Sequence, residues 1–188
     1  MFESSDTMKM KICLVGEGAV GKTSLIRRFV LDAFDDRYVS TLGAKITKKE
    51  MTFAAPNNGS EVHIDMTIWD IMGEKGFRDL LKEAYFHGAQ GILAVCDVTR
   101  ENTLPDLESW ISAIETVTGK IPIAFLANKI DLKDQLTFTE NDIRRMSGKY
   151  QSPYLFTSAK TGENVEKAFK EIATAIVESK VAQSVCTH

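Results

Sequence analysis

Short apolar runs alternate with segments of helical periodicity along most of the chain. Apolar or alternating stretches bounded by turn residues predict strands near residues 9–15, 44–54, 62–69, 91–97, 121–127 and 153–157. Apolar residues three and four apart predict helices near 22–32, 75–84, 103–117, 139–149 and 162–180. Because two strands follow each other directly only once, we expect an α/β fold with a six-stranded mixed sheet, one antiparallel strand pair and helices on both faces.

Two of these stretches show which of their faces is buried. Apolar residues of the last helix form one stripe, made of Val165, Ala168, Phe169, Ile172, Ala173, Ile176 and Val177. The strand at 62–69 alternates, with Val62, Ile64, Met66 and Ile68 facing one way and His63, Asp65, Thr67 and Trp69 the other. Trp69 is therefore a large aromatic residue on an otherwise polar face.

Length and composition fit a single domain. The chain has 188 residues, 44% apolar and 26% charged, which suffices for one hydrophobic core. We expect a flexible segment at 1–8, the domain at 9–180 and a short tail at 181–188. A net charge of −3 without a basic stripe argues against general binding of nucleic acids.

Apolar runs are too short to span a bilayer, and the N-terminus lacks a signal-peptide pattern, so we expect a cytoplasmic protein. Cys13 and Cys96 lie in strand-like runs without metal-ligand spacing, which is typical of small buried hydrophobic residues and not of disulfides. His63 and His87 lack companions at ligand spacing, so we assign them no catalysis.

A glycine-rich motif follows the first predicted strand and opens the first predicted helix. Residues 16–23 read G-E-G-A-V-G-K-T and match the phosphate-binding pattern G-x-x-x-x-G-K-[ST]. In such a loop backbone N–H groups surround phosphates, Lys22 reaches the β- and γ-phosphates, and the Thr23 hydroxyl binds Mg²⁺. The expected binding residues here are Gly16, Gly18, Ala19, Val20, Gly21, Lys22, Thr23 and Ser24. The alternative is a glycine-rich turn without a ligand.

Two further segments follow predicted strands and indicate which base is bound. They read N-K-I-D at 128–131 and S-A-K at 158–160. Ligands of open α/β sheets bind outside the carboxyl ends of the strands, where both segments would join the phosphate loop. The Asp131 carboxylate can accept hydrogen bonds from N1–H and the exocyclic amine of guanine, whereas adenine has no N1–H, and such sites reject the wrong base by roughly 10⁴ or more. By itself, 128–131 would be an ordinary Asn- and Asp-rich turn.

Together these motifs resemble those of a small GTPase of the Ras superfamily, most closely the Rab branch. The resemblance runs from Met10 to about Glu178 and includes W-D-I-M-G-E at 69–74. It implies the G domain of P-loop NTPases, with GTP and GDP as ligands and Mg²⁺ as the metal. It also implies a molecular switch in vesicle trafficking or signalling.

The resemblance assigns roles to residues outside the phosphate loop. Thr41 would ligate Mg²⁺ and sense the γ-phosphate, Phe34 would pack against guanine, and Tyr38 would cover the phosphates. Asp70 would hold Mg²⁺ through water, and Gly73 would donate its backbone N–H to the γ-phosphate.

For the base, the resemblance implies that Asn128 and Asp131 read guanine. The N–H of Ala159, in the Ser158-to-Lys160 segment, would donate to guanine O6, with Lys129 and Lys160 on either side.

Glu74 departs from the family, which usually has a glutamine that orients the attacking water. An amide both donates and accepts, whereas an ionised carboxylate only accepts and places negative charge near the γ-phosphate. With Lys22, Thr41 and Gly73, Glu74 completes the expected catalytic set of a slow GTPase. Three alternatives stay open: a GTP-loaded interaction module with negligible turnover, a Glu74 side chain that simply faces solvent, and an ATP-dependent enzyme, which Asp131 disfavours.

Gly18 leaves space beside the γ-phosphate where the arginine of a partner can enter, which is typically worth about 10³ to 10⁵ in rate. Ala19 replaces a frequent family glycine and should be tolerated if its backbone is not left-handed.

Effectors, an exchange factor and a GTPase-activating protein are the expected partners. Ile46, Trp69 and Tyr85 resemble positions of a Rab-type effector patch, with packing on the second switch as the alternative.

Cys186 stands third from the end and does not form a prenylation box, so no lipid anchor is expected, and any membrane contact would pass through partners. We expect a monomer. The turn-rich stretch 54–61 lengthens the hairpin beyond the family's usual size.

Overall fold

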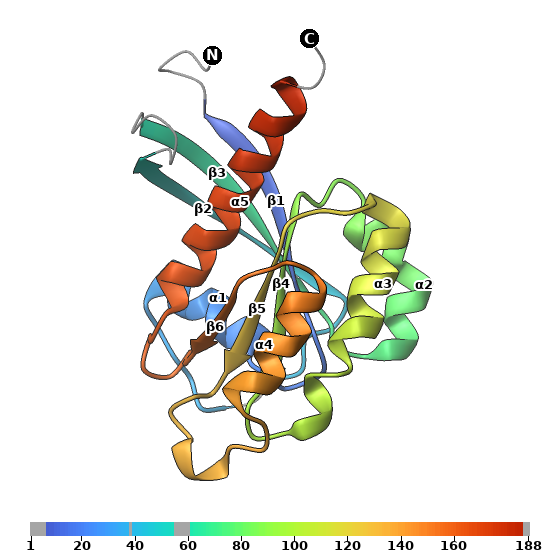
Figure 1. The fold of residues 1–188 in the computed structure, drawn as a ribbon. Coiled ribbons are helices and arrows are strands. Elements are labelled where there is room, and N and C mark those ends of the chain that lie inside the picture. Colours follow the sequence, from blue (N-terminus) through green and yellow to red (C-terminus); the bar gives the residue numbers. More distant parts are fainter. Residues whose placement is uncertain (1–6, 38, 55–60, 186–188) are drawn as a thin grey trace.

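The computed structural model describes residues 7–37, 39–54 and 61–185. Within them, six strands form one sheet in the order β2-β3-β1-β4-β5-β6 (Figure 1). These are β1 (Met8–Val15), β2 (Ala44–Ala54), β3 (Glu61–Ile71), β4 (Gly91–Asp97), β5 (Ile123–Asn128) and β6 (Tyr154–Thr157). β2 pairs antiparallel with β3, and the other neighbours pair parallel. The predicted α/β fold with a mixed sheet and one antiparallel pair is confirmed.

Helices cover both faces of this sheet (Figure 1). Residues of α1 (Lys22–Leu31) and α5 (Val165–Val185) share one hydrophobic core, while α2 (Lys75–Phe86), α3 (Leu107–Thr118) and α4 (Glu140–Lys149) contribute to the other. Because side chains along a strand alternate between the two faces of the sheet, β1 contributes to both cores. Ile12 and Leu14 belong to the first core, and Cys13 and Val15 belong to the second. The fold thus has three layers, with the sheet between two layers of helices.

Several helix ends differ from the predicted ones for local reasons. α3 begins at Leu107 instead of 103, because residues 101–103 form a separate 3-10 turn. α5 begins at Val165 instead of 162, since Gly162 and Asn164 adopt the left-handed values φ 87° and φ 55°. α5 then continues to Val185, so residues 181–185 extend the helix and are not a separate tail.

Both predicted core cysteines are buried and free. Burial raises the pKa of the Cys13 thiol to about 12, so this sulfur is an inert hydrophobic group. Cys186 lies outside the described residues. Among the described helices, none combines the length and the apolar character needed to cross a bilayer.

The seven-residue apolar stripe predicted for α5 is buried throughout, and Phe169 at its centre is fully buried. The Phe169 ring stacks on Phe29 of α1, with a centroid distance of 3.9 Å and an interplanar angle of 3°. This pair joins α5 to the helix that begins in the phosphate-binding motif.

We expect Phe169→Ala to lower the free energy of unfolding by about 3 to 5 kcal/mol, because it removes a fully buried ring and leaves a cavity. Urea denaturation would measure the change. Lys167→Ala, on the exposed side of the same helix, is the control and should stay within about 0.5 kcal/mol. Equal stability of the two variants would contradict the packing role of Phe169.

Candidate functional site

A cavity of about 410 Å³ opens at the carboxyl ends of the parallel strands. Most of the predicted site residues line it: Gly18, Ala19, Gly21, Lys22, Thr23, Ser24, Phe34, Thr41, Gly73, Glu74, Asn128, Lys129, Asp131, Ala159 and Lys160. Gly16, Val20, Asp70 and Ser158 lie behind this lining, and Tyr38 is outside the described residues. The volume suits a small-molecule ligand, so five sequence segments converge on one site of suitable size.

The glycines of the phosphate loop permit its close packing. Gly16 and Gly21 have φ values of 137° and 102°, which side-chain-bearing residues rarely adopt. A Cβ on Gly16 would overlap the carbonyl oxygen of Val95, and one on Gly21 would overlap the Asn128 amide. By contrast, a Cβ on Gly18 would meet nothing within 4 Å, so open space lies beside this residue.

Lys22 places a cation inside this loop. It is 7% exposed, and its Nζ donates to the carbonyl oxygens of Gly16 at 2.6 Å and Glu17 at 2.8 Å. Burial lowers the pKa of Lys22 to about 8, against the opposing charges of Asp70 and Glu17. An anion in the loop would compensate this buried charge directly.

Three oxygen-bearing side chains meet beside Lys22. The Thr23 hydroxyl donates to Asp70 Oδ2 at 2.5 Å and lies 3.0 Å from the Thr41 hydroxyl. Burial raises the pKa of Asp70, and its Oδ1 is buried with no hydrogen-bond partner among the described residues. Hard oxygen ligands of this kind suit Mg²⁺. The residues present therefore fit the expected metal, with Asp70 placed behind the two hydroxyls.

The base-reading segments are tied to the phosphate loop by Asn128. Its side chain is buried, and Nδ2 donates to the Val20 carbonyl at 2.9 Å. Its Oδ1 accepts from the Thr157 hydroxyl at 3.2 Å and the Ala159 N–H at 3.3 Å. One amide thus connects three loops.

Ser158 acts behind the cavity lining. Its hydroxyl donates to Asp131 Oδ1 at 2.6 Å, so it orients the carboxylate that faces the cavity. Ser158 is therefore a support for Asp131 in this arrangement.

Sequence reasoning missed three supporting residues. Arg28 of α1 donates from Nε to the Ala159 carbonyl at 2.9 Å and from Nη2 to the Lys160 carbonyl at 2.7 Å. Asp97 is the last residue of β4 and Arg100 lies just after it; Asp97 contacts Lys129, and Arg100 contacts Gly18. No pattern distinguishes Arg28 from its neighbour Arg27, but the charge of Asp97 at the end of an apolar strand was a usable signal.

The segment that joins β3 to α2 lies against the phosphate loop at Gly73. A Cβ on Gly73 would overlap the backbone N of Gly18, so the two backbones are in close contact. Glu74, which follows, is exposed and lines the cavity just before α2.

Ile46, Trp69 and Tyr85 differ in exposure. Ile46 is 52% exposed and pairs with Trp69 across β2 and β3. Trp69 and Tyr85 are half-buried against the core under α2 and α3, and the Lys11 ammonium lies 3.7 Å from the centroid of a Trp69 ring. Trp69 and Tyr85 therefore show the packing that was the alternative to an effector patch, while Ile46 is exposed to solvent.

Ala19 has a left-handed backbone, with φ 62°. Alanine was expected to be tolerated at this position only if the backbone was not left-handed. It therefore carries a steric cost here, because its Cβ crowds the backbone in this conformation. The strain lies in the loop that would hold the phosphates.

We expect Ala19→Gly to raise the free energy of unfolding by about 1 kcal/mol, since glycine has no steric penalty at this angle. The midpoint of thermal unfolding should rise by about 2 to 4 °C in a domain of this size. Ala113→Gly within α3 is the control and should destabilise by about 1 kcal/mol. A lower midpoint for Ala19→Gly would show that the angle costs nothing.

Comparisons with known proteins agree with this site. The Ras family model matches residues 11–178. The chain is 32% identical to the Ras-related protein Rab-21 of Geodia cydonium, over 92% of this chain and 73% of that protein. It is 34% identical to Rab-18-B of Danio rerio, over 90% and 80%, and 31% identical to Rab-27B of Homo sapiens, over 89% and 79%. The chain is therefore a GTP-binding switch that belongs to the Ras family of small GTPases, with Rab proteins among its relatives.

Proposed function

We propose that the chain hydrolyses GTP to GDP and phosphate with Mg²⁺ and signals its nucleotide state through the segments around Thr41 and Gly73. The observation that carries this proposal is the Asp131 carboxylate, held by Ser158 in the same cavity as Lys22 and Thr23. A base reader and a phosphate binder in one cavity support a guanine nucleotide as ligand.

In this proposal the bound Mg²⁺ would neutralise charge on the phosphates. Thr23 and Thr41 would supply direct hydroxyl ligands, and Asp70 would act through water. The short contacts among these side chains support that grouping. Asp70 Oδ1, which has no hydrogen-bond partner within 7–37, 39–54 and 61–185, leaves an acceptor for such a water. Lys22 would bind the β- and γ-phosphates as a point charge.

A switch needs elements whose position depends on the ligand. Thr41 reaches the site from the segment before β2, and Gly73 from the segment before α2. Contacts of both residues with a γ-phosphate would be lost on hydrolysis and would release the two segments. Exposed Val39, Leu42 and Ile46 lie on or next to the first segment, which supports an effector surface there.

Glu74 is the basis of the second candidate, a persistently GTP-loaded module with negligible turnover. Its exposed carboxylate at the cavity edge cannot donate a hydrogen bond to a phosphate oxygen when ionised. The open space beside Gly18 supports stimulation by the arginine of an activating partner. The nucleotide chemistry is common to both candidates, and turnover separates them.

We expect slow, Mg²⁺-dependent conversion of GTP in a single-turnover assay on the GTP-loaded protein. Glu74→Gln should raise the rate about tenfold, because the amide can both donate to a phosphate oxygen and accept from water. Lys22→Ala should abolish stable loading.

Glu83→Gln, which changes an exposed glutamate on α2, the helix that follows Glu74, is the matched control and should leave the rate unchanged. Bound GTP that is not converted, by either the parent protein or Glu74→Gln, would favour the loaded module. Equal rates for the parent protein and Glu74→Gln would mean that Glu74 takes no part.

We expect guanine nucleotides to displace a fluorescent GDP analogue at concentrations roughly 10⁴ lower than adenine nucleotides. Asp131→Ala should remove most of this preference, because it removes the acceptor for the N1–H and the amine of guanine. Asp134→Ala, exposed in the next turn, should retain it. Equal competition by ATP and GTP would contradict the proposed base.

A further inference from the structure

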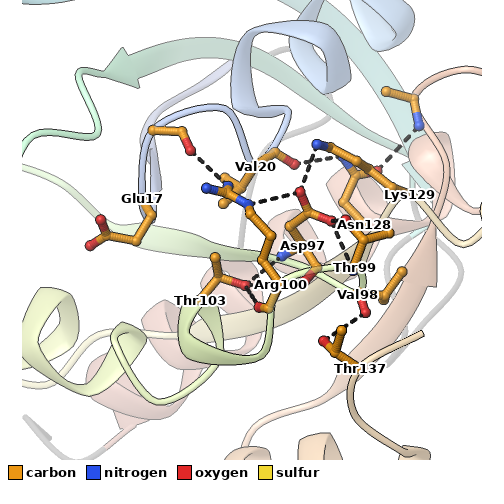
Figure 2. Close-up of polar contacts among 12 residues, drawn as sticks. Glu17, Val20, Asp97, Val98, Thr99, Arg100, Thr103, Asn128, Lys129 and Thr137 are labelled. Carbon is orange, nitrogen blue, oxygen red and sulfur yellow. Dashed lines mark hydrogen bonds and ion pairs between the residues drawn. The ribbon is translucent and has the colours of Figure 1, made fainter. Parts of the chain in front are cut away.

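Asp97 forms a buried charged junction at the end of β4. Its side chain is 1% exposed, and both carboxylate oxygens have partners (Figure 2). Oδ1 accepts from the Thr99 N–H at 3.0 Å and the Thr99 hydroxyl at 2.7 Å. Oδ2 accepts from Lys129 Nζ at 2.6 Å and Arg100 Nε at 3.1 Å. A buried carboxylate between two cations is thus firmly held.

Arg100 extends this junction to the phosphate loop. Its Nε binds Asp97 (Figure 2), and its Nη2 donates to the Gly18 carbonyl at 2.7 Å. Lys129, the second cation at Asp97 Oδ2, belongs to the base-reading segment. A continuous chain of contacts therefore runs from that segment through Asp97 and Arg100 to Gly18.

The backbone that carries Arg100 is itself fixed. The Asp97 N–H donates to the Thr103 hydroxyl at 2.9 Å. The Thr103 hydroxyl in turn donates to the Arg100 carbonyl at 2.7 Å. Thr137 adds a hydrogen bond to the Val98 carbonyl at 3.1 Å. Arg100 thus reaches Gly18 from a rigid turn.

The contact sets the orientation of one peptide plane. In a trans peptide the carbonyl of Gly18 and the N–H of Ala19 point in opposite directions. Arg100 holds the carbonyl and is not among the residues that line the cavity, whereas Ala19 is. The Ala19 N–H therefore points away from Arg100, and Ala19 itself lines the cavity where the phosphates are expected.

The same contact accounts for the unfavourable backbone of Ala19. A left-handed alanine persists only where its surroundings determine the conformation. The Gly18 carbonyl, fixed by a charged donor, is an immediate constraint on the φ angle of Ala19, because both belong to one peptide unit and its attached Cα.

We propose that Arg100 is a positioning residue for nucleotide binding: it holds the Gly18 carbonyl and couples the phosphate loop to the base-reading segment through Asp97 and Lys129. This inference rests on the proposed binding of guanine nucleotides. Arg100 touches neither base nor phosphates. Its effect is to keep the Ala19 N–H in place, so nucleotide leaves more slowly than from a loop without this support.

The test is the release rate of a fluorescent GDP analogue from the full chain. Arg100→Ala should raise it about tenfold, as expected for loss of a charge-assisted hydrogen bond. Arg100→Lys keeps the charge but lacks the fork that reaches both acceptors, and should give an intermediate rate. Arg145→Ala is the matched control: Arg145 also pairs with an aspartate three residues earlier, Asp142, and is 82% exposed. Its release rate should stay within about twofold of the parent rate.

A second readout separates positioning from a loss of overall stability. The ³¹P resonance of the β-phosphate of bound GDP should shift in Arg100→Ala and not in Arg145→Ala. In an Ala19→Gly background the loss of Arg100 should accelerate release by a different factor than in the parent protein, because the two residues act on one peptide unit.

The outcomes distinguish the inference from the function on which it rests. If the parent protein binds GDP and Arg100→Ala releases it at the parent rate with an unshifted resonance, the inference is wrong and the proposed function stands. If the parent protein binds no guanine nucleotide, the proposed function fails and the inference fails with it.

Discussion

The buried side-chain amide of Asn128 is the contact on which the site depends. It donates to the phosphate loop at Val20 and accepts from Thr157 and Ala159, so one group fixes three loops relative to one another. Only a side chain with both a donor and acceptor can satisfy all of these partners away from water. Gly21 has to lack a Cβ for the amide to fit, so the last glycine of the motif and the distant Asn128 depend on each other.

Buried charge is the second constraint. Lys22 and Asp70 lie at the same cavity, and burial lowers the pKa of the lysine and raises that of the carboxyl group. Each shift disfavours the charged form, so the protein alone solvates neither group well. A polyanion that carries a divalent cation would offer an opposite charge to both. The electrostatics of the site therefore favour the ligand that its shape and hydrogen bonds also fit.

Two arginines bind backbone carbonyl groups of the phosphate loop and of the segment 158–160. Arg28 binds the carbonyl oxygens of Ala159 and Lys160, and Arg100 binds that of Gly18. Because a trans peptide turns its carbonyl and N–H groups in opposite directions, donors placed behind a loop leave N–H groups free at its front. The guanidinium group suits this task, since it offers several donors in a fixed plane and stays charged. Rigid loops with free N–H groups are what an anion site requires.

The sequence by itself determined the α/β fold, the antiparallel pair and most of the cavity lining, because strand and helix periods and the phosphate-loop motif are local patterns. The predicted starts of α3 and α5 were several residues too early, since a 3-10 turn and left-handed residues near Gly162 depend on specific hydrogen bonds and angles. Tertiary structure alone decided the left-handed state of Ala19, the half-burial of Trp69, and the roles of Arg28, Asp97 and Arg100. The physical reason is distance along the chain: Arg100 meets Gly18 across 82 residues, and Arg28 meets Ala159 across 131. Such contacts exist only once the strands have brought their ends to one edge of the sheet.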